Sequence, residues 1–186
     1  MTPPGGSCRA SQTPTPSKGL RITAIDDKHA QLPWIGNPKD EGAGSEEGPL
    51  PDGRGTVRDF DSGSIYLSPE TGAHEVHGAI RDKYGQTRKW IGYPTTDETG
   101  CPDGVGRFNH FEHGSIYWTP ETGAHEVHGA IRDKWQSMGW ERSKLRYPMT
   151  DEHDIPGGRA SNFQGGEIQW TQTGGPVVRK SQRLDD

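Results

Sequence analysis

The sequence predicts an α+β fold built from three tandem units, each a short helix followed by a β-hairpin. Two observations support this prediction: an internal repeat and a composition rich in turn-forming residues. The segment Gly63–Lys83 recurs as Gly114–Lys134 with two differences in 21 positions, at an offset of 51 residues. The match is too long to arise by chance, so the chain repeats one structural unit. The 186 residues include 27 Gly and 15 Pro, and only 27% are hydrophobic, which favours short elements joined by turns.

Weaker echoes extend the repeat to a third unit. Residues 163–171 repeat 111–119, and residues 25–38 echo 80–94. Each copy has a corner of the form Ile/Leu-x-Tyr/Asn-Pro, where proline stops a preceding helix. An acidic pair follows each corner, namely Asp40-Glu41, Asp97-Glu98 and Asp151-Glu152. Each unit therefore contains a helix, a corner, an acidic loop and a hairpin, in that order.

The repeat also sets the expected domain boundaries. They are a repeat domain over 20–180, units at about 20–77, 78–128 and 129–180, and tails at 1–19 and 181–186. The N-terminal tail is rich in Pro, Ser, Thr and Gly, and we expect it to be disordered. Units of this kind bury their apolar faces against their neighbours. We expect a compact pseudo-symmetric array, with a closed propeller-like ring and a short curved stack as the alternatives.

Within a unit, the segment Gly114–Trp118 is expected to be a strand, whose side chains alternate between two faces. Ile116 and Trp118 share the face that is apolar in all three units, which makes it the core face, and Tyr117 lies on the other. A Pro-Glu-Thr-Gly turn follows and leads into a return strand. That strand is expected to carry Val76, Val127 and Val178 in the three units. A helix of two or three turns then starts near Ala130.

Charge and hydropathy exclude several classes of partner. The net charge is −5 and no run of Lys or Arg occurs, so we expect no nucleic-acid partner. No apolar stretch approaches the roughly 18 residues of a membrane span. The N-terminus shows no charged region followed by an apolar one, so no secretion signal is visible. The two cysteines, Cys8 and Cys101, do not by themselves indicate a disulfide.

Two copies of a His-Glu-Val-His motif, His74–His77 and His125–His128, are similar to the zinc-protease motif. That motif needs two histidines four residues apart on one helix face. Here the spacing is three and the segment is a predicted strand, where such positions face opposite sides. In the third unit we align Pro176 and Arg179 with the two histidines. We therefore expect no metal and no cofactor, and histidines that hydrogen-bond within or between units.

The acidic pairs have both a structural and a catalytic interpretation. Paired carboxylates perform glycoside hydrolysis. Adjacent acids in a repeated loop are more typical of cap or turn residues that accept backbone N–H groups. The sequence has no Gly-rich phosphate loop, Gly-x-Ser-x-Gly elbow or Cys-His nucleophile pattern. We therefore expect no enzyme, and a hydrolase with a carboxylate or metal site is the least favoured alternative.

The aromatic residues point to a ligand. Six Trp and five Tyr are more than small cores need, and sugar rings stack on such side chains while polar groups meet the hydroxyls. Tyr66 and Tyr117 lie on the non-core strand face, where either a ligand or a neighbouring unit would cover them. Trp34 and Trp90, which precede corners, are candidates for the core as well. The residues expected to bind the ligand are Tyr66, Tyr117, Glu75, His77, Glu126, His128 and Trp90.

Three motifs resemble the LGFP repeat. They are the corner Ile91–Pro94, the strand Phe111–Tyr117 and the junction Thr122–Ile131, and the resemblance covers about residues 20–180. LGFP repeats occur at the C-terminal end of some corynebacterial mycolyltransferases and in actinobacterial cell-wall hydrolases. The resemblance implies a compact disc-like array, an extracellular or cell-wall-associated location, and attachment to the cell wall.

The leading functional hypothesis is non-catalytic binding to cell-wall polysaccharide or peptidoglycan through repeated shallow sites. Repeated weak sites on a polymer gain from multivalency. The alternative is a protein-interaction or oligomerisation module, which predicts one larger apolar patch. In the third unit Gln169 replaces Tyr, so that unit either binds less or serves as a terminal cap.

Overall fold

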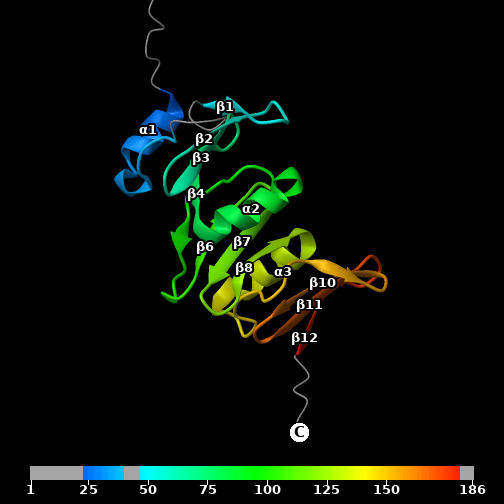
Figure 1. The fold of residues 1–186 in the computed structure, drawn as a ribbon. Coiled ribbons are helices and arrows are strands. Elements are labelled where there is room, and N and C mark those ends of the chain that lie inside the picture. Colours follow the sequence, from blue (N-terminus) through cyan, green and yellow to red (C-terminus); the bar gives the residue numbers. More distant parts are fainter. Residues whose placement is uncertain (1–22, 40–46, 181–186) are drawn as a thin grey trace, which may run out of the picture.

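The computed structural model describes residues 23–39 and 47–180. The two expected tails and the first acidic pair, Asp40-Glu41, lie outside these residues. Over the described ranges the chain forms an α+β fold with three α-helices and three four-stranded antiparallel sheets (Figure 1). The α+β class and the three repeated units are thus confirmed. Among these residues no helix is both long enough and apolar enough to cross a membrane.

Each sheet follows its helix along the chain. The first unit contains α1 (Ala24–Ala30), β1 (Gly48–Pro49), β2 (Thr56–Asp59), β3 (Gly63–Ser68) and β4 (Gly72–His77). The second contains α2 (Gly78–Ile91), β5 (Thr99–Gly100), β6 (Arg107–His110), β7 (Gly114–Thr119) and β8 (Gly123–His128). The third contains α3 (Gly129–Met138), β9 (His153–Ile155), β10 (Gly158–Phe163), β11 (Gly166–Thr171) and β12 (Gly175–Lys180). Short 3₁₀ turns lie at Pro33–Ile35 and Trp140–Arg142.

Local sequence features account for where the helices begin and end. Thr23 and Asp26 form a reciprocal capping box that starts α1. In α2 the buried residues Ile80, Tyr84, Thr87 and Ile91 recur every three or four positions, which gives one apolar stripe. The helix ends at a glycine, Gly92, whose φ of 80° few other residues adopt.

Each sheet is a four-stranded meander rather than the single hairpin that we expected. The predicted hairpins are present as β3–β4, β7–β8 and β11–β12. A second pairing extends each one, because a tight turn after a buried phenylalanine folds the preceding strand back; the phenylalanines are Phe60, Phe111 and Phe163. The first two strands of the second sheet, β5 and β6, have two and four residues and lack an alternating apolar pattern. Such short segments carry no periodic signal.

The register of the third hairpin differs from our alignment by one residue. Ile168 pairs with Val178 as Ile116 pairs with Glu126. Arg179 thus occupies the place of Val76 and Val127, whereas Val177 and Lys180 match His125 and His128. Placing Val178, Pro176 and Arg179 at those positions was therefore wrong. The turn contains two glycines, and the second, Gly175, has the positive φ that Gly123 has in the second unit.

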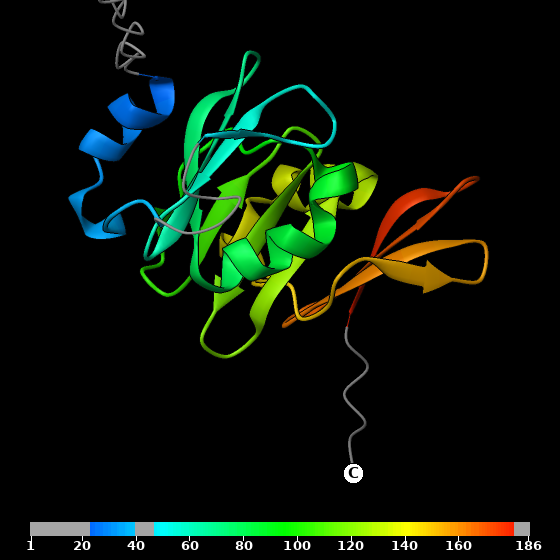
Figure 2. The same ribbon diagram turned by 45° about the horizontal axis from the view of Figure 1, so that its top comes forward.

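The units form an open row and not a closed ring. Helix α2 packs between the first and second sheets, and α3 packs between the second and third, while α1 covers the first sheet. The first and third sheets lie at opposite ends of the molecule (Figures 1 and 2). No closed barrel or propeller forms over the described residues, so the ring alternative was wrong. Both faces of β3 and β7 are buried because each lies between two helices.

Candidate binding site at the junctions between units

An aspartate from each acidic loop connects consecutive units. Asp97 Oδ1 accepts hydrogen bonds from His74 Nδ1 at 3.2 Å and from the Glu75 backbone N–H at 3.1 Å. Its other oxygen accepts from Lys28 Nζ at 2.8 Å. His74 and Lys28 belong to the first unit and Asp97 to the second. Burial alone raises the pKa of Asp97, but the bonds from His74 and Lys28 outweigh it and hold that pKa far below its usual range.

The next junction repeats this arrangement with equivalent atoms. Asp151 accepts from His125 Nδ1 at 3.2 Å, from the Glu126 backbone N–H at 3.2 Å and from Lys83 Nζ at 2.6 Å. In the two pairs that the structure describes, the aspartate accepts a backbone N–H as expected, but the N–H belongs to the preceding unit and not to a local cap or turn. The expectation that the motif histidines hydrogen-bond within or between units is confirmed.

The second histidine of each motif lies between two carboxylates, which we call the carboxylate–histidine cluster. His77 Nδ1 meets Glu75 Oε2 at 2.9 Å, and its Nε2 meets Glu98 Oε1 of the next unit at 3.2 Å. The Glu98 backbone N–H also donates to Glu75 Oε1 at 2.9 Å. The second cluster consists of His128, Glu126 and Glu152, with distances of 2.8, 3.3 and 3.0 Å in the same order.

Burial and charge oppose each other in these clusters. Burial by itself lowers the pKa of His77, but the hydrogen bond to Glu75 and the charge of Glu98 raise it above its ordinary value overall. His128 shows the same net rise from the same causes. Burial raises the pKa of Glu98 despite the favourable charges of Arg107 and His77. The net rise in pKa favours the protonated form of the imidazole where two units meet.

An exposed tryptophan covers each cluster. The Trp34 ring lies 4.7 Å from the His77 ring at an angle of 61°, and Trp90 lies 4.7 Å from His128 at 53°. The two tryptophans are 47% and 43% exposed, so neither is part of the core. The cavity at the first junction has a volume of about 580 Å³ and is lined by Leu32, Trp34, Glu75, His77, Asp97, Glu98 and Arg107.

The second junction also has a cavity, but its walls differ. Its volume is about 220 Å³, and its lining consists of Ala130, Ile131, Glu152, Arg159 and Trp170. Arg107 and Arg159 contact Glu98 and Glu152 with their Nε atoms in the two junctions. Trp90 and His128, the equivalents of Trp34 and His77, do not line this second cavity. We call the 580 Å³ cavity the first junction cleft, and the surface where Trp90, His128, Glu152 and Arg159 meet the second junction cleft.

The structure brings together some of the expected ligand residues and separates others. Glu75, His77, Glu126, His128 and Trp90 all lie at the junctions. Tyr66 and Tyr117 are 7% and 2% exposed because α2 and α3 cover them. Of the two alternatives for these tyrosines, the structure shows the interface between units, so ligand binding by them was the wrong expectation.

Sequence reasoning missed the corner tyrosines. Tyr93 donates its hydroxyl proton to Asp52 at 2.7 Å, and Tyr147 donates to Asp103 at 2.6 Å, in each case in the Pro-Asp-Gly loop of the preceding unit. The Gly106 backbone N–H also donates to the Tyr147 hydroxyl at 3.1 Å. The first corner has Asn37 in place of this tyrosine, a difference that is visible in the sequence.

Three stretches of the chain, residues 44–88, 91–143 and 145–183, match the sequence profile of the LGFP repeat. They cover well over half of the 186 residues. The chain belongs to the LGFP repeat family. A comparison with curated proteins found no match to this chain. Each match starts before its sheet, and the first two continue into the following helix, so the phase of the profile differs from that of the helix-first units above.

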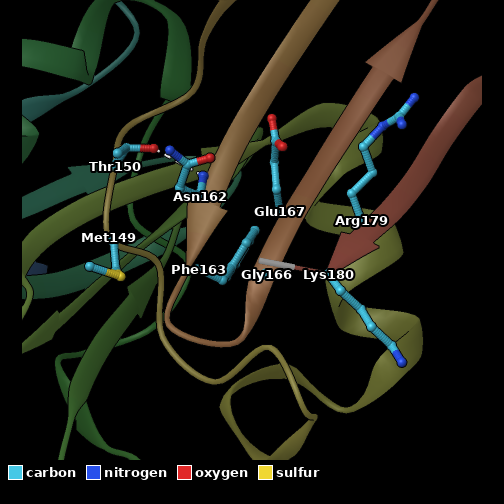
Figure 3. Close-up of a pocket in the computed structure, with 8 residues that line it drawn as sticks. All are labelled: Met149, Thr150, Asn162, Phe163, Gly166, Glu167, Arg179 and Lys180. Carbon is cyan, nitrogen blue, oxygen red and sulfur yellow. Dashed lines mark hydrogen bonds between the residues drawn. The ribbon is translucent and has the colours of Figure 1, made fainter. Parts of the chain in front are cut away.

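The end of this LGFP array carries a third hollow. Its volume is about 810 Å³, and its eight lining residues are Met149, Thr150, Asn162, Phe163, Gly166, Glu167, Arg179 and Lys180 (Figure 3). The equivalent sheet faces of the first two units are covered by α2 and α3. Here Gln169 and Arg179 replace the buried Tyr117 and Val127. Polar residues on an uncovered end are typical of a terminal cap.

None of the described residues forms a group of three or more His, Cys, Asp or Glu side chains arranged to hold a metal ion. The two histidines of each motif take different partners, Asp97 for His74 and Glu75 with Glu98 for His77. The Cys101 thiol is buried, which raises its pKa to about 12, while Cys8 lies outside the described residues.

Proposed function

We propose that this LGFP array is a non-catalytic binding module for a cell-wall glycan, either polysaccharide or peptidoglycan, and that it acts outside the cell. The sugar binds at the junction clefts. One observation carries this proposal: an exposed tryptophan stands beside a carboxylate–histidine cluster at both junctions. The site is therefore repeated, as a module for a repeating polymer requires.

The chemistry of the clefts suits a sugar. The indole of Trp34 offers an apolar face on which the C–H face of a pyranose can stack. The partly exposed Asp97 and Arg107 offer an acceptor and donors for hydroxyl groups within the same cavity. Its volume of about 580 Å³ falls within the range of small-molecule sites, roughly 300–1,000 Å³. Binding of one polymer at two such clefts would raise the overall affinity through multivalency.

The engagement of the carboxylates supports binding over hydrolysis. Glu75 is buried and hydrogen-bonded to His77, and Glu98 forms an ion pair with the same imidazole. Arg107 also contacts Glu98. A general acid or nucleophile needs a carboxyl group that faces its substrate, whereas these groups hold two units together.

The test is retention of the folded protein on insoluble cell-wall material after washing with salt. We expect the wild type to be retained and a Trp34→Ala/Trp90→Ala variant to lose at least tenfold in retention without loss of folding. Val105→Ala is the matched control because Val105 is an exposed apolar residue outside the clefts. A folded wild type that binds no wall from several bacterial types would contradict the proposal.

A second candidate function, protein interaction, is favoured by the open hollow at the end of the third sheet. It predicts a stable dimer or a captured partner that Lys180→Glu and Arg179→Glu would disrupt. The same variants should leave retention on cell walls unchanged if the junction clefts bind the glycan.

A further inference from the structure

The two junction clefts contain the same arginine but not the same partner for it. Arg107 pairs across the sheet with Gly100, and Arg159 pairs at the equivalent place with Asp154. Arg159 donates from one terminal nitrogen, Nη1, to Asp154 at 2.8 Å and from the other to the Glu152 carbonyl at 3.1 Å.

At the first cleft one terminal nitrogen has no such acceptor. Arg107 contacts Glu98 through Nε and through Nη2, which lies 3.5 Å from the Glu98 carbonyl oxygen. Within the described residues its Nη1 meets no carboxylate, because glycine stands where the next unit has Asp154. A guanidinium group has five donors in a fixed fork. The first cleft therefore offers a donor that the protein itself satisfies in the second.

We propose that Arg107 binds the acyl oxygen of an N-acetylated hexosamine glycan in the first cleft, and that Asp154 blocks the equivalent interaction in the second. This inference rests on the proposed glycan binding and names its substrate class. The first cleft is then the primary site and the second a weaker one. Gly100 and Asp154 are the positions that set the difference.

The charges of the first cleft select a neutral acceptor. Glu75, Asp97 and Glu98 all line the cavity, so an added carboxylate on the ligand would meet like charges. An acetamido carbonyl accepts from the guanidinium without adding charge. The exposed indole of Trp34 supplies the surface against which the sugar ring packs. An N-acetylated neutral sugar offers Arg107 an acceptor without added charge. A uronic acid places a further carboxylate beside the three in the cavity, and a de-N-acetylated amino sugar places an ammonium donor where Arg107 needs an acceptor.

Positions 100 and 154 both tolerate substitution. A Cβ atom added at Gly100 would meet no atom within 4 Å. The Asp154 side chain is 86% exposed and its removal leaves the other contacts of Arg159 in place. Gly100→Asp should therefore give Arg107 the intramolecular partner that Arg159 has, and Asp154→Gly should release Arg159. Neither change replaces a residue that is proposed to contact the sugar.

The experiment is calorimetric titration of the full chain with three tetrasaccharides: N-acetylglucosamine, its de-N-acetylated form and galacturonic acid. We expect the wild type to bind the acetylated form at least tenfold more tightly than the other two. Gly100→Asp should weaken that binding about tenfold, the effect of losing one hydrogen bond from a charged donor. Asp154→Gly should add a second site of similar affinity.

The double variant Gly100→Asp/Asp154→Gly should move the tighter site to the second junction. Trp90→Ala would then cost more affinity than Trp34→Ala, the reverse of the wild-type order. Equal affinity of the wild type and Gly100→Asp, or equal or tighter binding of either unacetylated tetramer, would overturn the inference.

Failure of this inference is distinguishable from failure of the proposed function. If cell walls retain the wild type through Trp34 and Trp90 but the Gly100 and Asp154 variants behave identically to it, the role of Arg107 is wrong and glycan binding stands. If no wall retains the folded wild type, the proposed function itself is wrong.

Discussion

At the scale of single residues, His77 has a carboxylate against each ring nitrogen, Glu75 on one side and Glu98 on the other. A neutral imidazole has only one N–H to donate, so both contacts are satisfied only when the ring is doubly protonated. The raised pKa of His77 agrees with this geometry, and Arg107, on the far side of Glu98, is the one charge that opposes it. His128 is placed in the same way between Glu126 and Glu152.

This geometry gives a pH dependence. A histidine whose pKa is higher in the folded state stabilises fully below its unfolded pKa, about 6.5, and loses that contribution as pH rises through the folded value. We expect the urea midpoint of unfolding to fall as pH increases from about 6.5 to 8. His77→Gln/His128→Gln should flatten that slope, whereas His113→Gln, at an exposed position, should not. A slope that is the same in both variants would show that the clusters do not titrate in this range.

The sequence could identify most residues of the clefts but not their surroundings. Residue type and repetition singled out His77, Glu75 and Trp90, and these three do lie at the junctions. Tyr66 has the same alternating position that an exposed residue would have. Tyr66 is buried because α2 packs against the strand face that the sequence assigns as the non-core face. Strand alternation contains no information about a second helix on that face.

At the scale of elements, the corners of the second and third units are bound to the loop of the preceding sheet through Tyr93 and Tyr147. The Tyr147 ring is buried, and its hydroxyl donates to Asp103 and accepts from the Gly106 backbone N–H. Tyr147→Phe should leave that buried N–H without a partner and lower the free energy of unfolding by roughly 1–3 kcal/mol. Tyr117→Phe is the control, since the Tyr117 hydroxyl makes no hydrogen bond with the residues the structure describes, and urea denaturation of both variants measures the difference. Equal destabilisation by the two changes would argue against a role for the corner hydroxyl.

Element prediction succeeded where the sequence is periodic. The β3–β4 and β7–β8 hairpins and the helix after each follow from alternating apolar residues and a glycine turn. The outer strands β1 and β5 contain two residues each, and tertiary pairing rather than local preference forms them. The third hairpin was misaligned because Gly174 and Gly175 are both suited to the turn, and only the paired register decides between them.

At the scale of the whole molecule, the number of units does not determine whether an array closes. A ring and an open row have the same unit boundaries, and they differ in the angle between neighbours, which side-chain packing around α2 and α3 sets. The sequence did contain one relevant signal. Gln169 stands where Tyr66 and Tyr117 stand, and a polar residue there is consistent with a sheet face that none of the described helices covers.

That terminal face has Gln169 and Arg179 at the positions where the second unit has the buried Tyr117 and Val127, and a polar face promotes association less than an apolar one. Gln169→Tyr with Arg179→Val would restore the residues of the second unit, Tyr117 and Val127, on a face that already exposes Val177. An uncovered apolar sheet face promotes association. We expect the wild type to sediment as a monomer and the double variant to self-associate in a concentration-dependent way, while Gln169→Glu with Arg179→Lys remains monomeric. A wild type that already forms a stable dimer, dispersed by Arg179→Glu, would instead identify the third sheet as an interface and give the protein-interaction hypothesis its first support.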